Sequence, residues 1–154
     1  MTRYPLLCSF QEFVPGRGYV AGVKMAGRAL ATEEAQEWWI YGVNPGGIAE
    51  SGRTLIEAHA QLRASLRRYL SDVAHDAADF EAFKTEVERF FNETDAESIA
   101  EWEAAVADVR SGKTNLDELA KAPADAERSV KVHQVVLASV KPVQALDEGP
   151  AVAA

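Results

Sequence analysis

The stretch Val43-Asn44-Pro45-Gly46-Gly47-Ile48-Ala49-Glu50-Ser51-Gly52-Arg53-Thr54-Leu55-Ile56-Glu57-Ala58 decides most of the fold of this chain. In it a strand ends at a Pro-Gly turn, a short second pairing follows, and a helix begins. Thr54 and Glu57 have the Thr-x-x-Glu spacing of a capping box, in which the threonine hydroxyl accepts a free amide of the first turn and the glutamate reaches back to the cap. We therefore predict a helix from about Leu55. The residues that we assign structural roles in this turn and helix start are Pro45, Gly46, Gly52, Thr54 and Glu57.

Upstream of this stretch, three apolar segments have the composition of β-strands: residues 4–10, 19–30 and 38–43. Gly22 and Gly27 interrupt the second segment and are candidates for bulges or close contacts. The polar residues 33–37 favour a reversal between the second and third segments, so we expect these two to form an antiparallel hairpin. Residues 47–50 are expected to form a short further pairing before the helix.

Downstream of Thr54 the apolar period becomes helical, and it predicts one face that should lie on the sheet. A second helix is expected from about Asp79, and a third from Thr94, where Thr94 and Glu97 repeat the capping-box spacing. Gly112 is the expected stop of the third helix. We expect these last two helices to form an acidic helical hairpin within a helical insertion of about residues 76–122. The apolar face of the first helix comprises Leu55, Ala58, Leu62, Leu66, Tyr69, Leu70 and Val73.

Residues 129–140 return to the alternation of a strand, and Pro142 closes it. The whole pattern predicts an α+β fold, with a small antiparallel β-sheet and the acidic helical hairpin inserted before its last strand. We expect a single domain over residues 1–142. Residues 143–154 carry Pro, Gly and Ala without periodicity, and we expect them to form a flexible tail.

Composition limits the class of protein. The chain has 154 residues, of which 47% are hydrophobic, enough for one domain whose core needs no disulfide or metal. Cys8 is the only cysteine, which excludes an internal disulfide and favours a reducing compartment. No stretch approaches the roughly 20 apolar residues of a membrane span, and the N-terminus lacks the basic and apolar segments of a secretion signal. We therefore expect a cytoplasmic protein without membrane contact.

The motifs of common enzymes are missing or incomplete. Ser111-Gly112-Lys113-Thr114 looks like the end of a phosphate-binding loop, but that motif needs a glycine where Ala107 stands and a strand in front, where we expect a helix. No Gly-x-Ser-x-Gly nucleophile elbow occurs. The histidines lie on different elements without a second ligand at metal-binding spacing: His59, His75 and His133. We predict no enzyme, and no catalytic, cofactor or metal site.

Nucleic-acid binding is an alternative that the aromatic residues leave open. Trp38, Trp39 and Tyr41 could stack on bases, and Arg63 and Arg67 lie one helical turn apart. The formal net charge of −8, however, argues against non-specific binding to a phosphate backbone. We favour an interpretation in which Trp39 and Tyr41 face one side of a strand and Trp38 the other, with one side in the core. The charge suits a basic partner better.

Three runs of the sequence resemble the HicB antitoxins, over about residues 18–73 with a candidate final strand at 129–140. That family shows a Gly-Tyr-x-Ala strand, a Leu-Pro-Gly turn, and Gly-(Asp)-Thr-x-x-Glu-Ala opening a helix. The resemblance implies a β-β-β-α-β, partial RNase H-like fold that acts by binding and not by catalysis. It also implies a partner, a HicA-type toxin, which is a small basic ribonuclease with a double-stranded-RNA-binding-like fold. The runs are Tyr19-Val20-Ala21, Val43-Asn44-Pro45-Gly46, and Gly52 to Ala58 continued by Leu62, Leu66 and Tyr69-Leu70.

The chain also departs from the family pattern. Residues 30–37 read as an insertion in the hairpin, Ser51 adds a residue before Gly52, and Arg53 replaces the common acidic residue. No ribbon-helix-helix or helix-turn-helix is visible at the C-terminus, so DNA binding by this chain is doubtful.

The expected mechanism is neutralisation of the toxin by an acidic surface, because charge complementarity speeds association and selects the partner. The alternatives that remain open are a homo-oligomeric scaffold or ligand-binding module of HicB-like fold, and the nucleic-acid binder above. We expect a homo-oligomer, and in the scaffold alternative an exposed strand edge would pair between subunits. The expected partner-binding residues are Glu86, Glu93, Asp95, Glu97, Glu101 and Asp108.

Overall fold

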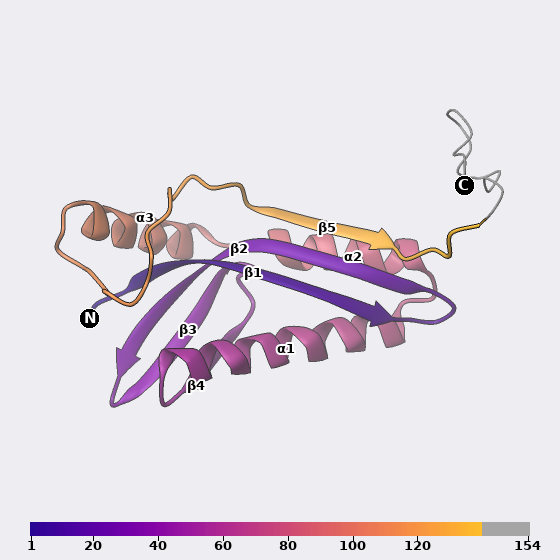
Figure 1. The fold of residues 1–154 in the computed structure, drawn as a ribbon, viewed down its shortest axis with the longest axis horizontal. Coiled ribbons are helices and arrows are strands. Elements are labelled where there is room, and N and C mark those ends of the chain that lie inside the picture. The colour runs from indigo at the N-terminus through magenta and orange to yellow at the C-terminus, as the bar shows by residue number, and fades with distance from the viewer. Residues whose placement is uncertain (140–154) are drawn as a thin grey trace.

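An antiparallel sheet of five strands and three helices make up residues 1–139, which are the part of the chain that the computed structural model describes (Figure 1). The chain is therefore α+β, as predicted. The expected flexible tail and Pro142 lie outside the described residues. The elements are β1 (Tyr4–Pro15), β2 (Val20–Glu34), β3 (Glu37–Asn44), β4 (Ala49–Gly52), α1 (Leu55–Asp76), α2 (Phe80–Asn92), α3 (Ala96–Arg110) and β5 (Ser129–Gln134).

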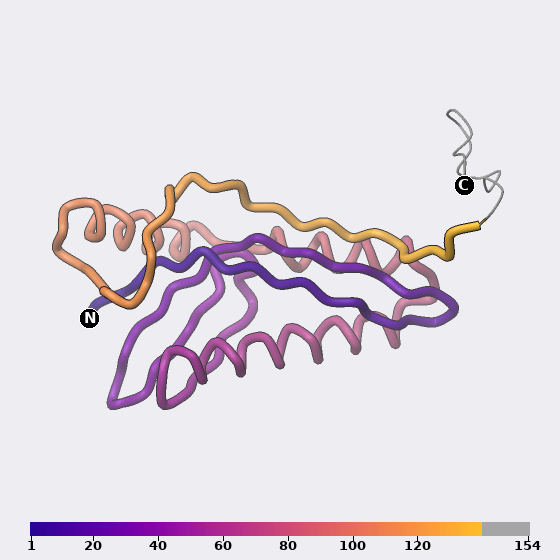
Figure 2. The backbone as a smooth tube through the Cα atoms, viewed as in Figure 1, coloured from indigo at the N-terminus to yellow at the C-terminus, as the bar shows by residue number. Residues whose placement is uncertain are grey.

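β2 is the central strand, and its two edges are used differently. β1 pairs along one edge, from Tyr4 opposite Ala31 to Pro15 opposite Val20. β5 and β3 share the other edge end to end, because β5 pairs with residues 21–26 of β2 and β3 with residues 28–34. β4 extends the sheet beyond β3. Figure 2 shows β5 running beside the first half of β2.

The last strand joins the sheet as predicted, but it is shorter than expected. It ends at Gln134, after which the N–H of Val135 still donates to the carbonyl of Val20 at 2.8 Å. β2 begins at Val20, so the chain beyond this point has no strand to pair with. Val136 and Leu137 are accordingly 61% and 93% exposed.

The hairpin between β2 and β3 corrects the prediction that residues 30–37 are an insertion. β2 continues to Glu34 and β3 begins at Glu37, so most of the supposed insertion is paired strand. Only Ala35 and Gln36 form the turn, with φ angles of 51° and 67°. Positive φ at both central residues is typical of a two-residue hairpin turn whose twist matches that of the flanking strands.

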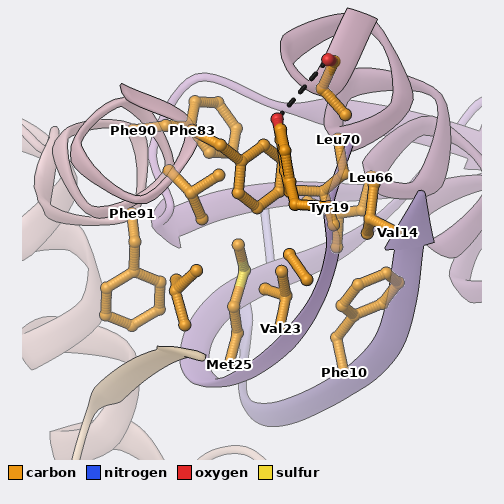
Figure 3. Close-up of a cluster of buried hydrophobic side chains, with 14 residues drawn as sticks. Phe10, Val14, Tyr19, Val23, Met25, Leu66, Leu70, Phe83, Phe90 and Phe91 are labelled. Atoms are coloured by element: carbon orange, nitrogen blue, oxygen red, sulfur yellow. Dashed lines mark hydrogen bonds between the residues drawn. The ribbon is translucent and has the colours of Figure 1, made fainter. Parts of the chain in front are cut away.

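The main core lies between one face of the sheet and helices α1 and α2 (Figure 3). Phe83 and Leu70 are fully buried and pack with Val23 and Met25 of β2. The Tyr19 hydroxyl donates to the carbonyl of Ala74 at 3.5 Å, which ties the first hairpin to α1. Other members of this cluster include Phe10, Val14, Ala21, Leu66, Val87, Phe90, Phe91 and Val132.

Helix α1 starts as predicted. The Thr54 hydroxyl accepts the N–H of Glu57 at 3.0 Å, and the helix begins at Leu55. The second half of the predicted capping box differs, because the Glu57 carboxylate accepts the N–H of Arg53 at 3.4 Å and not that of the cap itself. The buried stripe of the helix is Ala58, Leu62, Leu66, Leu70 and Ala74.

The predicted capping box at Thr94 is wrong by one residue. Asp95 is the N-cap of α3, and its carboxylate accepts the N–H of Ser98 at 2.7 Å. The Thr94 hydroxyl is buried without a hydrogen-bond partner among the described residues. The predicted stop is confirmed, because α3 ends at Arg110 and Gly112 has a φ of 80°.

The predicted helical hairpin is also wrong. α2 packs against β5, α1 and β2, whereas α3 packs against β1 and β3. Trp102 of α3 lies in a separate cluster with Leu30, whose side chain leaves the opposite face of β2 from that of Met25. The N–H of Gly46 donates to the carbonyl of Glu93 at 3.0 Å, so the link between the helices passes the end of β3. The two helices therefore lie end to end and do not pack side by side (Figure 1).

Candidate protein-binding site

The six acidic residues predicted to bind a partner do not form one surface. Glu86 lies between α1 and α2, where it accepts the Tyr69 hydroxyl at 2.9 Å and pairs with Arg89 at 2.6 Å. The hydrogen bond from Arg89 lowers the pKa of Glu86, so this carboxylate is already compensated within the fold. Asp108 is near the far end of α3, about 20 Å along the helix from Asp95 at 1.5 Å per residue.

Three of the remaining four, Glu93, Asp95 and Glu101, line or adjoin a pocket of about 370 Å³ between the β3–β4 turn and the first turns of α3. Ser98 and Glu101 line it, and Asp95 is hydrogen-bonded to Ser98. Glu93 lies at its edge, with its Oε1 3.5 Å from the place that a Cβ on Gly47 would take. We call this the acidic pocket; its lining residues are Leu30, Tyr41, Gly42, Val43, Gly46, Gly47, Ile48, Ala49, Ser98 and Glu101.

The glycine-rich turn that opened the sequence analysis makes the floor of the acidic pocket. The Gly42 N–H donates to the carbonyl of Ile48 at 2.8 Å, which folds the turn back on β3. A Cβ on Gly42 would stand 1.9 Å from the Pro45 carbonyl oxygen, and one on Gly46 would stand 2.9 Å from that of Glu93. Pro45 and Gly46 thus have the predicted place in the turn. They also bring α3 close to β3, which the sequence did not indicate.

Tyr41 lines the acidic pocket, and Trp39 is stacked on it. Tyr41 is 41% exposed, and its ring stacks on that of Trp39 at 5.9 Å between centroids and 16° between planes. The predicted alternation is confirmed: Ile40 is fully buried and Trp38 packs against the same core cluster, on the side of β3 opposite Trp39 and Tyr41. The Tyr41 hydroxyl donates to Glu34 at 3.1 Å. Burial and this hydrogen bond to a carboxylate raise the pKa of Tyr41.

Carboxylates outnumber cations around the acidic pocket. Arg3 pairs with Glu101 at 3.4 Å, with 44% of the Arg3 side chain exposed, and Arg89 pairs with Glu93 at 3.1 Å. Glu97 is exposed in the first turn of α3 and has no ion pair within residues 1–139. Exposed ion pairs of this kind exchange partners at little cost. The site can therefore accept a further cation, held between an aromatic face and a carboxylate.

Arg28 and Asn44 are buried next to the strand residues that line the acidic pocket, Leu30 and Val43, and the sequence analysis missed them. Arg28 is 9% exposed and Asn44 is 5% exposed. The guanidinium lies 5.4 Å from the centre of the Trp102 ring, so it connects β2 to α3. The only signal in the sequence is a charged residue in the middle of an apolar strand, which by itself does not say what it contacts.

The arginines and the phosphate-loop-like segment considered in the sequence analysis make contacts away from the acidic pocket. Arg67 forms an ion pair with Glu12, and the Arg63 guanidinium lies 5.7 Å from the centre of the Phe10 ring. The Thr114 N–H donates to the carbonyl of Asp108 at 3.0 Å, as part of the turn that follows α3. Within residues 1–139 no three His, Cys, Asp or Glu side chains are grouped to hold a metal ion. In the same range, none of the helices combines the length and the apolar character needed to cross a membrane.

Comparisons with protein-family models, with curated proteins and with solved structures give no match to this chain. What it does must therefore be inferred from its own residues and their arrangement.

Proposed function

We propose that this chain is a non-catalytic protein of the HicB antitoxin kind, which captures a small basic ribonuclease toxin at the acidic pocket. The observation that carries the proposal is the pairing of an exposed aromatic ring, Tyr41, with the carboxylate of Glu101 across one pocket. An arginine or lysine side chain is the group that such a pair binds best, since the ring face and the carboxylate both attract a cation.

Neutralisation follows from the toxin's own chemistry. A ribonuclease that grips RNA does so through Lys and Arg side chains on the phosphate backbone. A protein that occupies those side chains excludes the RNA without any chemical step. The net charge of −8 also raises the rate at which a cationic protein meets this one.

The arrangement of the sheet is compatible with the HicB resemblance. Three long strands precede the Thr54-capped helix, α1 lies on one face of the sheet, and the late strand β5 joins the same sheet. The short strand β4 and the helices α2 and α3 are additions to the β-β-β-α-β order of that family. α3 is the addition that matters for function, because it supplies Ser98 and Glu101 to the acidic pocket.

The test is a titration calorimetry series with a purified HicA-type toxin, made as its catalytically inactive variant and encoded in the reading frame next to this chain. We expect 1:1 binding that weakens with salt, and at least a tenfold loss of affinity for Tyr41→Ala and for Glu101→Lys, which is about 1.4 kcal/mol. Glu118→Lys is the matched control, because it makes the same charge change on an exposed loop residue that does not line the acidic pocket.

Circular dichroism would establish that each variant is folded before its affinity is compared. Wild-type affinity in both Tyr41→Ala and Glu101→Lys would place the binding surface elsewhere. An absence of binding by the wild-type chain would refute the antitoxin assignment itself.

A further inference from the structure

β1 is a free edge of the sheet. Among the described residues it pairs with β2 alone, along its whole length from Tyr4 to Pro15. A long unpaired edge is a ready template for another strand, and proteins usually protect such an edge with charges, prolines or a covering element. The face of β1 that carries Leu7 and Phe13 is exposed as well, since these side chains are 40% and 63% exposed.

The register identifies which backbone groups of β1 point away from the sheet. The N–H of Gly16 donates to the carbonyl of Tyr19 at 2.8 Å, which closes the first hairpin. Because hydrogen-bonded positions alternate along an antiparallel strand, the even-numbered residues of β1 bond to β2 and the odd-numbered residues face outward. The outward-facing residues are Pro5, Leu7, Ser9, Gln11, Phe13 and Pro15.

This outward edge is complementary to itself. If β1 meets a second β1 running antiparallel, centred on Phe10, then Pro5 lies opposite Pro15 of the second copy. Leu7 lies opposite Phe13, and Ser9 lies opposite Gln11. The two prolines, which have no N–H to offer, face each other at both ends, and apolar and polar side chains each meet their own kind.

The neighbouring registers lack this match. A shift in one direction sets Pro15 against Leu7 and Phe13 against Ser9, and a shift in the other sets Pro5 against Phe13 and Leu7 against Gln11. Each shift places a proline opposite a residue whose carbonyl then has no N–H donor, and it also sets an apolar side chain against a polar one. The register centred on Phe10 is therefore the one in which the facing side chains match.

We propose that β1 is a dimerisation edge, and that it pairs with β1 of a second copy about a two-fold axis at Phe10. The result is one continuous sheet across the dimer, in which Leu7 of each copy lies next to Phe13 of the other. An interface of this kind is isologous, so it closes at two subunits. None of the outward-facing residues is charged, and the nearby Glu12 carboxylate is paired with Arg67. The cation nearest the axis is Arg63, whose guanidinium lies 5.7 Å from the centre of the Phe10 ring. The acidic pocket belongs to β3, β4 and α3, and it stays accessible in both copies.

Light scattering coupled to size exclusion tests the assembly. The wild-type chain is expected to be a dimer, and Gln11→Pro a monomer, because this substitution removes an outward N–H and leaves the ladder to β2 intact. Gln11→Thr is the matched control and should remain a dimer. Phe13→Lys, which places a charge opposite Leu7 of the second copy, should be a monomer as well.

Disulfide trapping tests the register. In a Cys8→Ser background, Ser9→Cys with Gln11→Cys should give covalent dimers on mild oxidation, since directly opposed hydrogen-bonded residues have Cα atoms about 5.5 Å apart. Leu7→Cys with Gln11→Cys, which requires the shifted register, should give at least tenfold less. A monomeric wild-type chain, dimers that persist in both Gln11→Pro and Phe13→Lys, or equal trapping in the two double variants would each overturn the proposal. A toxin titration with Gln11→Pro distinguishes failure of the dimer proposal from failure of the toxin-binding proposal. Loss of the dimer should leave toxin binding at the acidic pocket intact.

Discussion

Arg28 donates two hydrogen bonds to the Oδ1 of Asn44, at 3.0 Å from Nε and 2.6 Å from Nη2. Both residues are buried, and they lie where the pairing of β2 with β3 shifts register next to Arg28. Burial lowers the pKa of Arg28, but the group remains a cation and needs an acceptor. Asn44 thus compensates a buried charge at the point where the sheet, the β3–β4 turn and α3 meet.

Replacing Asn44 with leucine should destabilise the protein by about 3 kcal/mol, because the Arg28 guanidinium would be left buried without its acceptor. Urea unfolding followed by circular dichroism measures this. The double variant Arg28→Met with Asn44→Leu should recover part of the loss, since it removes the charge together with its partner. An Asn44→Leu variant that unfolds at the wild-type urea concentration would show that the pair carries no such energy.

Two buried hydroxyls should be dispensable. The Oγ1 atoms of Thr32 and Thr94 have no hydrogen-bond partner within residues 1–139, and Thr32 is only 2% exposed. Valine has nearly the same shape without the polar atom, so Thr32→Val should raise the free energy of unfolding by roughly 1 kcal/mol. Thr94→Val should act in the same direction. The same change at an exposed position, Thr85→Val, is the control. A loss of stability in Thr32→Val would reveal an acceptor for the Thr32 hydroxyl.

The N-cap of α1 should be worth about 1 kcal/mol. Thr54→Ala removes the acceptor for the Glu57 N–H, and N-cap replacements of this type cost on the order of 1 kcal/mol. Thr54→Ser keeps the acceptor and should behave as wild type in the same urea experiment. The change concerns stability alone, so toxin affinity should be equal in the two variants once both are folded.

Local signals in the sequence predicted the helix starts and the strand segments well, because caps, turns and periodicity act over a few residues. The Thr54 cap, the helix start near Asp79 and the alternation about Ile40 are all found in the structure. The choice between Thr94 and Asp95 could not be made, since both residue types cap helices. Tertiary packing decides it by burying the Thr94 hydroxyl.

The placement of the helices was beyond local signals. The apolar stripe of α3 shows that Trp102 is buried, but not that it packs on the face of β2 opposite to α2. The acidic pocket was missed for the same reason, because Tyr41, the Gly46 turn and Glu101 are distant in sequence and meet only when α3 crosses the end of β3. All six acidic residues had been named individually, yet the pocket that three of them line or adjoin depends on that crossing.

His59 should make stability fall at mildly acidic pH. Burial and the nearby Arg63 lower the pKa of His59 below its ordinary value of 6.5, so the unfolded chain binds a proton more readily than the folded one. Stability therefore rises with pH through this range and is lost as the pH falls below about 6.5. Urea unfolding at pH 5.5 and 7.5 should show a smaller difference for His59→Gln than for the wild type. Glu86, whose pKa is also lowered, acts at a more acidic pH and does not interfere.

The single thiol should be protected by the fold. Cys8 is on the α1 side of β1, where it packs with Ala58 and Leu62, and burial raises its pKa to about 11. Only the thiolate attacks a disulfide reagent, so the rise in pKa from 9.0 to about 11 should make the folded protein react roughly 100-fold more slowly at pH 8 than an unperturbed cysteine. A chromogenic disulfide reagent followed by absorbance measures the rate. Ser9→Cys in a Cys8→Ser background should react fast as a monomer, because residue 9 is on the exposed face of the same strand. A native Cys8 that reacts as quickly as the urea-unfolded chain would mean that β1 detaches from α1 on the time scale of the assay.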